Sequence, residues 1–148
     1  MIRQELSDYG FMKKKSSKKT ASAGKSKPLC YETTDGFKIY VGKNNYQNDE
    51  LTFKIATGND WWFHAKQIPG SHVILKTEGR NVPDHIFEIA AAVAAYYSSG
   101  RESEKLEIDY VQKKEIKKPA KAVAGFVVYY TNYSMTVRPS LAEVTEVK

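Results

Sequence analysis

Residues 60–75, with the sequence DWWFHAKQIPGSHVIL, constrain the fold of this chain more than any other stretch. Two adjacent tryptophans, two histidines and a Pro-Gly turn lie within sixteen positions. On both sides of the turn the side chains alternate in character, which is typical of β-strands because successive side chains of a strand point to opposite faces. The stretch therefore predicts a β-hairpin.

The first strand of this hairpin presents two different faces. Trp62, His64 and Lys66 fall on one face, and Trp61 and Phe63 fall on the other. A strand that covers a core on one side keeps its polar side chains in water on the other side. We therefore predict that one face is buried and the other is wet, with Trp61 and Phe63 in the core rather than on the surface.

The register of the hairpin is left open by the sequence. Pro-Gly favours a type II turn, which suits a two-residue hairpin poorly, so we expect a longer loop over residues 67–70. With a four-residue loop, Lys66 faces Ser71, and the side chains of His64 and His72 point to opposite faces. A one-residue bulge brings the two histidines to the same face. The register decides whether they can share a ligand.

Length and composition indicate one soluble domain with a tail. A chain of 148 residues is long enough to bury a substantial core. No apolar run approaches the roughly 20 residues needed to cross a bilayer, and the first ten residues lack the apolar region of a signal peptide. The single cysteine, Cys30, allows no internal disulfide and no thiolate zinc site. We therefore expect a cytoplasmic location and no membrane partner.

The positive charge is concentrated at the N-terminus. Residues 1–28 hold eight of the 23 basic residues and two of the 17 acidic residues, which leaves fifteen of each sign in residues 29–148. Residues 1–9 show helical spacing of apolar side chains, and residues 11–28 are rich in Lys, Ser, Ala and Gly. We predict a helix end followed by a flexible, disordered basic tail over residues 1–28, and a folded domain over residues 29–148.

The remaining elements indicate an α+β fold, with a mainly antiparallel sheet and one long helix packed on a face. The longest periodic segment predicts a helix over residues 83–99, and a shorter helix is predicted over residues 50–56 with Asn48 or Asp49 as its cap. The predicted strands are a short one near residue 29, then 37–41, 61–66, 71–76, 106–111, and a final hairpin formed by 126–130 and 135–137.

Metal binding and catalysis find little support. His64 and His72, with Asp60 or His85, offer imidazole and carboxylate ligands, but their spacing matches no strong zinc signature. His64 has the right chemistry for a general base, yet no nucleophile or oxyanion-stabilising group accompanies it. We expect no catalytic residues, no metal and no cofactor.

Nucleic-acid binding accounts for more of the residues. Lysines neutralise phosphates, while asparagine and serine supply neutral hydrogen bonds that fix position. Aromatic rings or histidines stack on unpaired bases. The candidates lie in a polar loop, around the hairpin turn and in a late lysine-rich segment: Lys43, Asn44, Asn45, Lys66, Ser71, Lys113, Lys114, Lys117 and Lys118.

Structural roles compete with each of these functional interpretations. Tyr129, like the hairpin aromatics, is expected in the core rather than under a base. Asn44 and Asn45 can adopt turn conformations and bond their own backbone. The lysine-rich segment over residues 113–121 can be a solvated loop, and the basic tail can serve solubility or tethering alone.

Three separated motifs resemble one known family. DGFKIYVGKNN, DWWFHAKQIPGSHVIL and KKPAKAVAGFVVYYTNYSMTV are similar to motifs of the NFACT-R domain of the RqcH, NEMF and fibronectin-binding protein A family, and the resemblance covers roughly residues 31–139. The opening segment also resembles the end of the coiled coil that precedes this domain in full-length members. On this resemblance the chain is a C-terminal fragment of a bacterial member.

The resemblance implies an RNA-binding module in ribosome-associated quality control. Full-length members bind the large ribosomal subunit with a stalled peptidyl-tRNA and support C-terminal alanine tailing of the nascent chain. The implied partners are tRNA, large-subunit rRNA and the remaining domains of the parent protein, and the family name adds fibronectin as an alternative partner. The positions that match the motifs, and to which only a generic role in the functional surface is transferred, are Lys43, Asn44, Asn45, His64, Lys66, Gly70, Ser71 and His72.

Overall fold

A seven-stranded sheet, antiparallel throughout, forms the centre of the computed structural model, which describes residues 3–6 and 26–148. Its strands run in the spatial order β8-β6-β4-β5-β3-β2-β9. The strands are β2 (Leu29–Thr33), β3 (Lys38–Val41), β4 (Trp61–Ala65), β5 (Val73–Lys76), β6 (Leu106–Gln112), β8 (Tyr133–Val137) and β9 (Val144–Glu146). The predicted α+β fold with a mainly antiparallel sheet is confirmed.

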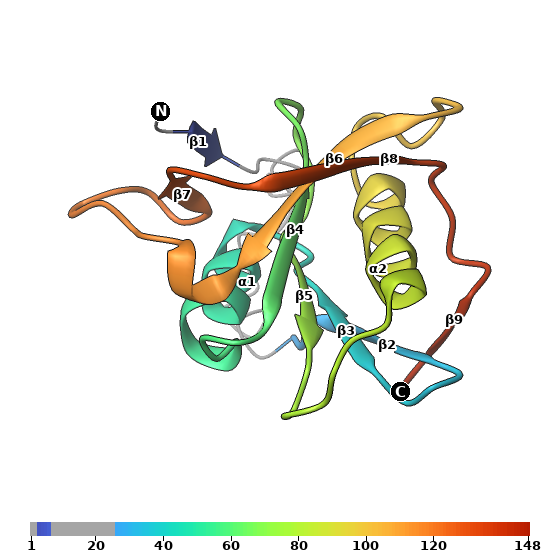
Figure 1. Cartoon of the computed structure of the whole chain (residues 1–148). Coiled ribbons are helices and arrows are strands. Elements are labelled where there is room, and N and C mark those ends of the chain that lie inside the picture. The colour runs from blue at the N-terminus through green and yellow to red at the C-terminus, as the bar shows by residue number, and fades with distance from the viewer. Residues whose placement is uncertain (1–2, 7–25) are drawn as a thin grey trace.

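The long helix forms as predicted. α2 (Asp84–Tyr96) begins directly after Pro83, whose ring fixes a backbone angle that suits a helix start. The helix packs on one face of the sheet, beside β4, β5, β6 and β8 (Figure 1). Its small side chains are buried against the strands and permit close packing: Ala90, Ala91, Ala94 and Ala95.

The shorter helix begins earlier than predicted. α1 (Asn45–Glu50) runs without interruption into a π-helical turn, η3 (Leu51–Ile55). The prediction that Asn48 or Asp49 caps this helix is wrong, because the cap is Asn44, whose side-chain oxygen accepts a hydrogen bond of 2.9 Å from the backbone N–H of Gln47. The side chains of Asn48 and Asp49 are used instead for contacts with distant segments.

The second face of the sheet is covered as well, so the predicted wet face is wrong. α1, η3 and the chain from residue 113 to residue 129 lie on the side opposite α2 (Figure 1). This second layer contributes Leu51 and Val127 to a separate core cluster around Trp62, which is fully buried. Because both faces of β4 are covered, His64 is also fully buried.

The register places the two histidines on one face. Phe63 pairs with Val73 and Trp62 pairs with Ile74, so the alternation brings His64 and His72 together, and their ring centroids are 5.8 Å apart. His72 is fixed from two sides, because its Nδ1 lies 2.8 Å from the Thr52 hydroxyl and its backbone N–H donates to Asn48. Burial, followed by the neighbouring His64, lowers the pKa of His72 well below the ordinary value.

Two predictions near the ends of the chain are wrong. Residues Arg3–Leu6 form a strand, β1, where a helix end was predicted, and β1 pairs with β7 (Phe126–Tyr129) in a separate two-stranded sheet. The predicted final hairpin does not form, because β7 pairs with β1 whereas β8 pairs with β6. Val127 and Tyr129 are buried in the second core cluster, which directs β7 away from β8.

The predicted basic tail falls mostly outside the described residues, which omit 1–2 and 7–25. Within the described part, Ser26 already contacts the domain, because the Gln47 side-chain amide donates to its backbone carbonyl. No helix in the described ranges is long and apolar enough to cross a membrane.

We predict that Trp62→Ala destabilises the domain much more than Trp61→Ala. Trp62 is 0% exposed, and truncating such a side chain costs about 3–5 kcal/mol through the cavity it leaves. Trp61 is only partly buried and should cost less. Urea unfolding of the two variants measures the difference. Equal losses would contradict the assignment of Trp62 to a second core.

We predict that the free energy of unfolding decreases as the pH falls below about 6.5. His72 has a lowered pKa in the folded state, so below the ordinary histidine pKa the unfolded chain takes up a proton that the folded chain does not. The slope approaches about 1.4 kcal/mol per pH unit for one such group. Urea unfolding at about pH 7.5 and about pH 5.5 measures this change in the free energy of unfolding.

Two variants, His72→Gln and His85→Gln, test whether the pH dependence of stability originates from His72. His72→Gln should reduce the stability difference between the two pH values, whatever it does to stability at neutral pH. His85 is 60% exposed and provides the matched control. An undiminished pH dependence in His72→Gln would assign the effect to other groups.

Candidate nucleic-acid interface

The second layer is attached to the sheet by a close backbone approach at Gly42. The Gly42 N–H donates to the carbonyl of His72, and a Cβ at Gly42 would lie 2.0 Å from the side-chain oxygen of Asn48. Only glycine fits in that space. The same Asn48 oxygen accepts from the His72 N–H, so this contact sets where the loop before α1 leaves the sheet.

The two candidate asparagines organise this layer. The turn-type interpretation of Asn44 is confirmed, because its side chain caps α1. The side chain of Asn45 packs against Gly125, where an added Cβ would approach its oxygen to 2.8 Å. The residues that flank the two asparagines are exposed: Lys43, which precedes them, and Tyr46, which follows them and is 79% exposed.

The lysine-rich segment is held against α1 and η3 rather than being a free loop. It follows β6 as a short 3-10 helix, η4 (Lys113–Glu115). The Lys114 N–H donates to the Gly58 carbonyl, and Lys117 exchanges two backbone hydrogen bonds with Val128. Lys118 Nζ lies 3.0 Å from the Asp49 carboxylate on α1. The segment is therefore attached to the domain, while its side chains Lys114 and Lys117 remain exposed to solvent, as the solvated-loop alternative expects.

The lysines of this segment differ in how free their ammonium groups are. Lys114 and Lys117 are exposed. Lys113 is half-buried, with its Nζ 5.7 Å from the centroid of the Phe53 ring, and Lys118 is held by Asp49. The exposed side chains therefore offer charge to a ligand more readily than the two partly buried ones.

The positions near the hairpin turn are mostly internal. His64 and His72 are fully buried, as described above, and Ser71 is 1% exposed. Gly70 is buried at a β-bridge with Ser98, and the Ser71 N–H donates to Tyr97 at the end of α2. In this conformation these groups shape the scaffold and do not reach a ligand at the surface.

Lys66 belongs to a polar network across the sheet. Its Nζ lies 3.0 Å from the buried carboxylate of Asp109 on β6, and only 20% of its side chain is exposed. The Asp109 carboxylate also accepts hydrogen bonds from the hydroxyls of Tyr129 and Ser134. The network links β4, β6, β7 and β8, which gives Lys66 a structural role whether or not it also contacts a ligand.

Of the candidate metal ligands, His64 and His72 lie together, whereas Asp60 and His85 are bound to other partners. The Asp60 carboxylate accepts hydrogen bonds from Lys76 Nζ at 2.6 Å and from the backbone N–H groups of Thr57 and Thr77. Burial alone raises the pKa of Asp60, but these hydrogen bonds outweigh it and lower the pKa. His85 contacts Asp35 at the surface. Residues 3–6 and 26–148 contain no cluster of three or more metal-ligating His, Cys, Asp or Glu side chains.

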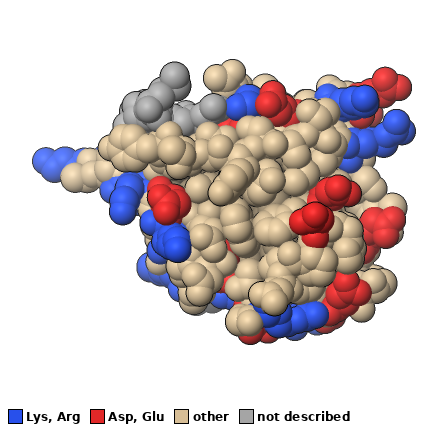
Figure 2. All heavy atoms as spheres, viewed as in Figure 1, with Lys and Arg blue, Asp and Glu red and all other residues tan. Residues whose placement is uncertain are grey.

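Two exposed tyrosines extend the interface beyond the sequence-based set. Tyr46 precedes the buried part of α1, and Tyr130, which is 59% exposed, directly follows β7. No sequence signal pointed to Tyr130, which ends the apolar run 126–130, whereas Tyr46 lies in the polar stretch 42–49. Figure 2 shows several Lys and Arg side chains along the left margin, where the segment after β6 runs in Figure 1, with an acidic side chain among them; further Lys and Arg side chains lie at the upper right and at the bottom of the view.

Comparison with known proteins gives the same family as the motifs. Residues 27–130 match the family described as the NFACT protein RNA binding domain. The chain is 40% identical over 148 residues to the Rqc2 homolog RqcH of Streptococcus suis and 38% identical over 151 residues to that of Bacillus subtilis. These alignments cover 99% of this chain and 26% of either relative, so the chain spans about a quarter of their length.

A solved structure has the same fold. The C-terminal part of the fibronectin/fibrinogen-binding protein from Streptococcus suis aligns with a TM-score of 0.75 and 44% sequence identity. The alignment covers 80% of this chain and 47% of that one. The family match extends over more than half of the sequence. The chain therefore belongs to the NFACT RNA-binding domain family.

Proposed function

We propose that this chain is the RNA-binding module of a ribosome-associated quality control factor, and that it contacts tRNA and large-subunit rRNA. In this proposal residues 29–148 form the NFACT-R domain, and the lysine-rich residues 11–28 link it to the other domains of the parent protein. The family match and the relatives named RqcH support it. The proposed role is binding in the cytoplasm, without catalysis.

The observation that carries the proposal is the joint exposure of lysines and tyrosines on the second layer. Lys43, Lys114 and Lys117 are exposed there, and Tyr46 and Tyr130 carry exposed rings. Lysines attract the phosphate backbone, and aromatic faces stack on unpaired bases. Because charges balance over residues 29–148, this local clustering, rather than the overall charge, provides the basic surface.

The other candidate residues support this surface in different ways. Lys113 and Lys118 add charge from partly buried positions, and Asn44 and Asn45 retain side-chain amide groups that can donate to a phosphate. His64, Lys66, Gly70, Ser71 and His72 act from within, by holding the sheet and the second layer in register. The chemistry suits loops and single strands of RNA, whose bases are free to stack.

We predict that the triple variant of Lys43, Lys114 and Lys117 to Ala weakens RNA binding and reduces its salt dependence. Each lost phosphate contact should lower the slope of log affinity against log salt by about one. Fluorescence anisotropy with labelled tRNA over a salt series measures the slope. The matched control replaces Lys105, Arg138 and Lys148, which are exposed elsewhere, and removes the same charge.

The basic tail must be separated from the folded surface. If circular dichroism shows that a chain beginning at Ser26 keeps its fold, we expect this chain to bind RNA without the lysines that precede Ser26. The second-layer variant should still lose affinity in that background, and the control variant should not. Equal effects of the two triple variants would mean that charge attracts RNA without an organised interface, and the proposal would then fail.

A second candidate function is binding of fibronectin. The observation in its favour is the solved structural neighbour, which is the C-terminal part of a fibronectin/fibrinogen-binding protein. Surface plasmon resonance with immobilised chain tests it. Fibronectin binding that survives added salt and is indifferent to the second-layer variant, together with unchanged tRNA affinity in that variant, would favour this function over the first.

A further inference from the structure

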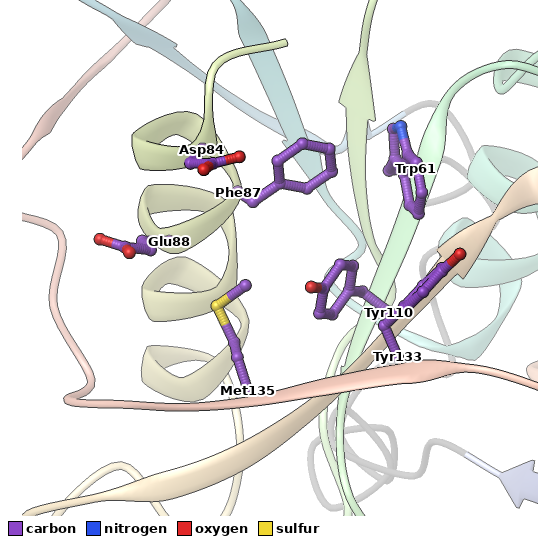
Figure 3. A pocket seen from close by; sticks show the side chains of 7 residues that line it. All are labelled: Trp61, Asp84, Phe87, Glu88, Tyr110, Tyr133 and Met135. Atoms are coloured by element: carbon purple, nitrogen blue, oxygen red, sulfur yellow. The ribbon is translucent and has the colours of Figure 1, made fainter.

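A pocket of about 390 Å³ lies on the face of the sheet that carries α2, away from the second layer. It is bounded by the first turns of α2 and by the neighbouring strands β4, β6 and β8 (Figure 3). None of the functional interpretations above uses it. Its lining combines aromatic rings with two carboxylates and includes no Lys or Arg.

The aromatic wall is built by strand register. Tyr110 on β6 pairs with Phe63 on β4 and with Tyr133 on β8, and Trp61 lies two residues before Phe63 on the same face. The Trp61 ring is 5.9 Å from Tyr110 and 6.1 Å from Tyr133. Phe87 reaches over from α2 and meets Trp61 edge-on at 5.0 Å, with an interplanar angle of 88°. The rings therefore surround a space from several directions.

The wall is accessible and of the right character for a ligand. Tyr133 is 61% exposed, and Trp61, Phe87 and Tyr110 are partly buried. Met135 lines the same pocket and adds an apolar, adaptable surface. Tyr110 and Tyr133 are tilted by 50° and 52° to Trp61 rather than stacked on it, whereas Tyr110 stacks on Phe63.

The negative charge comes from the first turns of α2. Asp84 and Glu88 line the pocket, and Figure 3 shows Asp84 extending toward the Phe87 ring while Glu88 lies on the other side of the helix. Glu88 also lines a second pocket beside Glu143, so the acidic character continues along the helix. The pKa of Tyr110 is raised mainly by burial, then by the neighbouring Tyr133 and then by Asp84. The last of these contributions agrees with a carboxylate that lies near the Tyr110 ring.

This combination selects a cation. The faces of aromatic rings attract positive charge, and the carboxylates strengthen that attraction while repelling phosphates. A guanidinium group uses both features, because its plane stacks on a ring and its edge donates paired hydrogen bonds to a carboxylate. A nucleobase can also stack on such rings, but its backbone phosphate would approach Asp84 and Glu88 unfavourably.

We propose that the pocket between α2 and strands β4, β6 and β8 binds an arginine side chain from a basic segment of a partner protein. Trp61 and Tyr133 stack on the guanidinium group, and Asp84 accepts its hydrogen bonds. The site lies across the sheet from the RNA-binding layer, so protein and RNA can be held together. The inference is independent of the RNA-binding role, because it rests on a different surface.

The test is an NMR titration of the isotope-labelled full chain with an acetylated, amidated Gly-Arg-Gly peptide. The expected result is a saturable shift of the Trp61 indole N–H signal with no comparable shift for buried Trp62. Asp84→Asn and Tyr133→Leu should each weaken binding by about fivefold. Glu104→Gln, an exposed acid that lines neither described pocket, is the matched control and should bind as the parent does.

Two results would overturn the proposal. One is peptide binding that is unchanged in both Asp84→Asn and Tyr133→Leu, with folding of the variants verified by their spectra. The other is saturation of the Trp61 signal by an oligouridine and not by the peptide, which would assign the pocket to RNA. Unchanged tRNA affinity in Asp84→Asn, measured in parallel, separates this site from the proposed RNA interface.

Discussion

Burial of β4 on both faces is the constraint on which the rest of this structure depends. Phe63 and Ala65 are enclosed by α2, and Trp62 and His64 are enclosed by the second layer. A buried donor or acceptor without a partner costs about 1–3 kcal/mol, and among the described residues the indole N–H of Trp62 on β4 is one such group. The second layer has to supply hydrogen-bonding partners as well as apolar cover.

The second layer supplies some of these partners through a few side chains that join distant segments, and it leaves the Trp62 indole N–H and the His72 Nε2 without one. Asn48 binds the backbone of His72, Thr52 binds its ring, and Asp49 binds both Lys118 and the backbone N–H of Gly125. These contacts tie α1 and η3 to the sheet and to the segment after β6. The exposed lysines and tyrosines of the same layer are therefore presented on a supported surface, which reduces the entropy lost on binding.

Local patterns predicted the elements better than their partners. The alternation around Phe63 and the periodicity of residues 83–99 are set by neighbouring residues, and both identified real elements. The partner of β7 and the cover over Trp62 depend on contacts between segments more than 50 residues apart in sequence, such as Asp49 with Lys118. No periodicity within one segment encodes such a contact.

The candidate site shows the same division. The lysines of the loop before α1 and of the segment after β6 could be recognised by residue type, because lysine is rarely buried without a partner. The burial of three other candidates, His64, Ser71 and His72, could not be recognised from the sequence, because histidine and serine occur both in cores and on surfaces. Tyr46 and Tyr130 lacked a pattern that would distinguish an exposed ring from a core ring until the fold placed them.

Adjacent tryptophans connect the two surfaces of the domain. Trp61 and Trp62 point to opposite faces of β4, so one lines the acidic aromatic pocket and the other supports the basic layer. If the two proposals hold, the surfaces attract ligands of opposite charge, and the sheet lies between those ligands. Because the sheet lies between the two surfaces, a ligand on one does not sterically block the other. Such an arrangement suits a module that holds RNA on one side and a basic protein segment on the other.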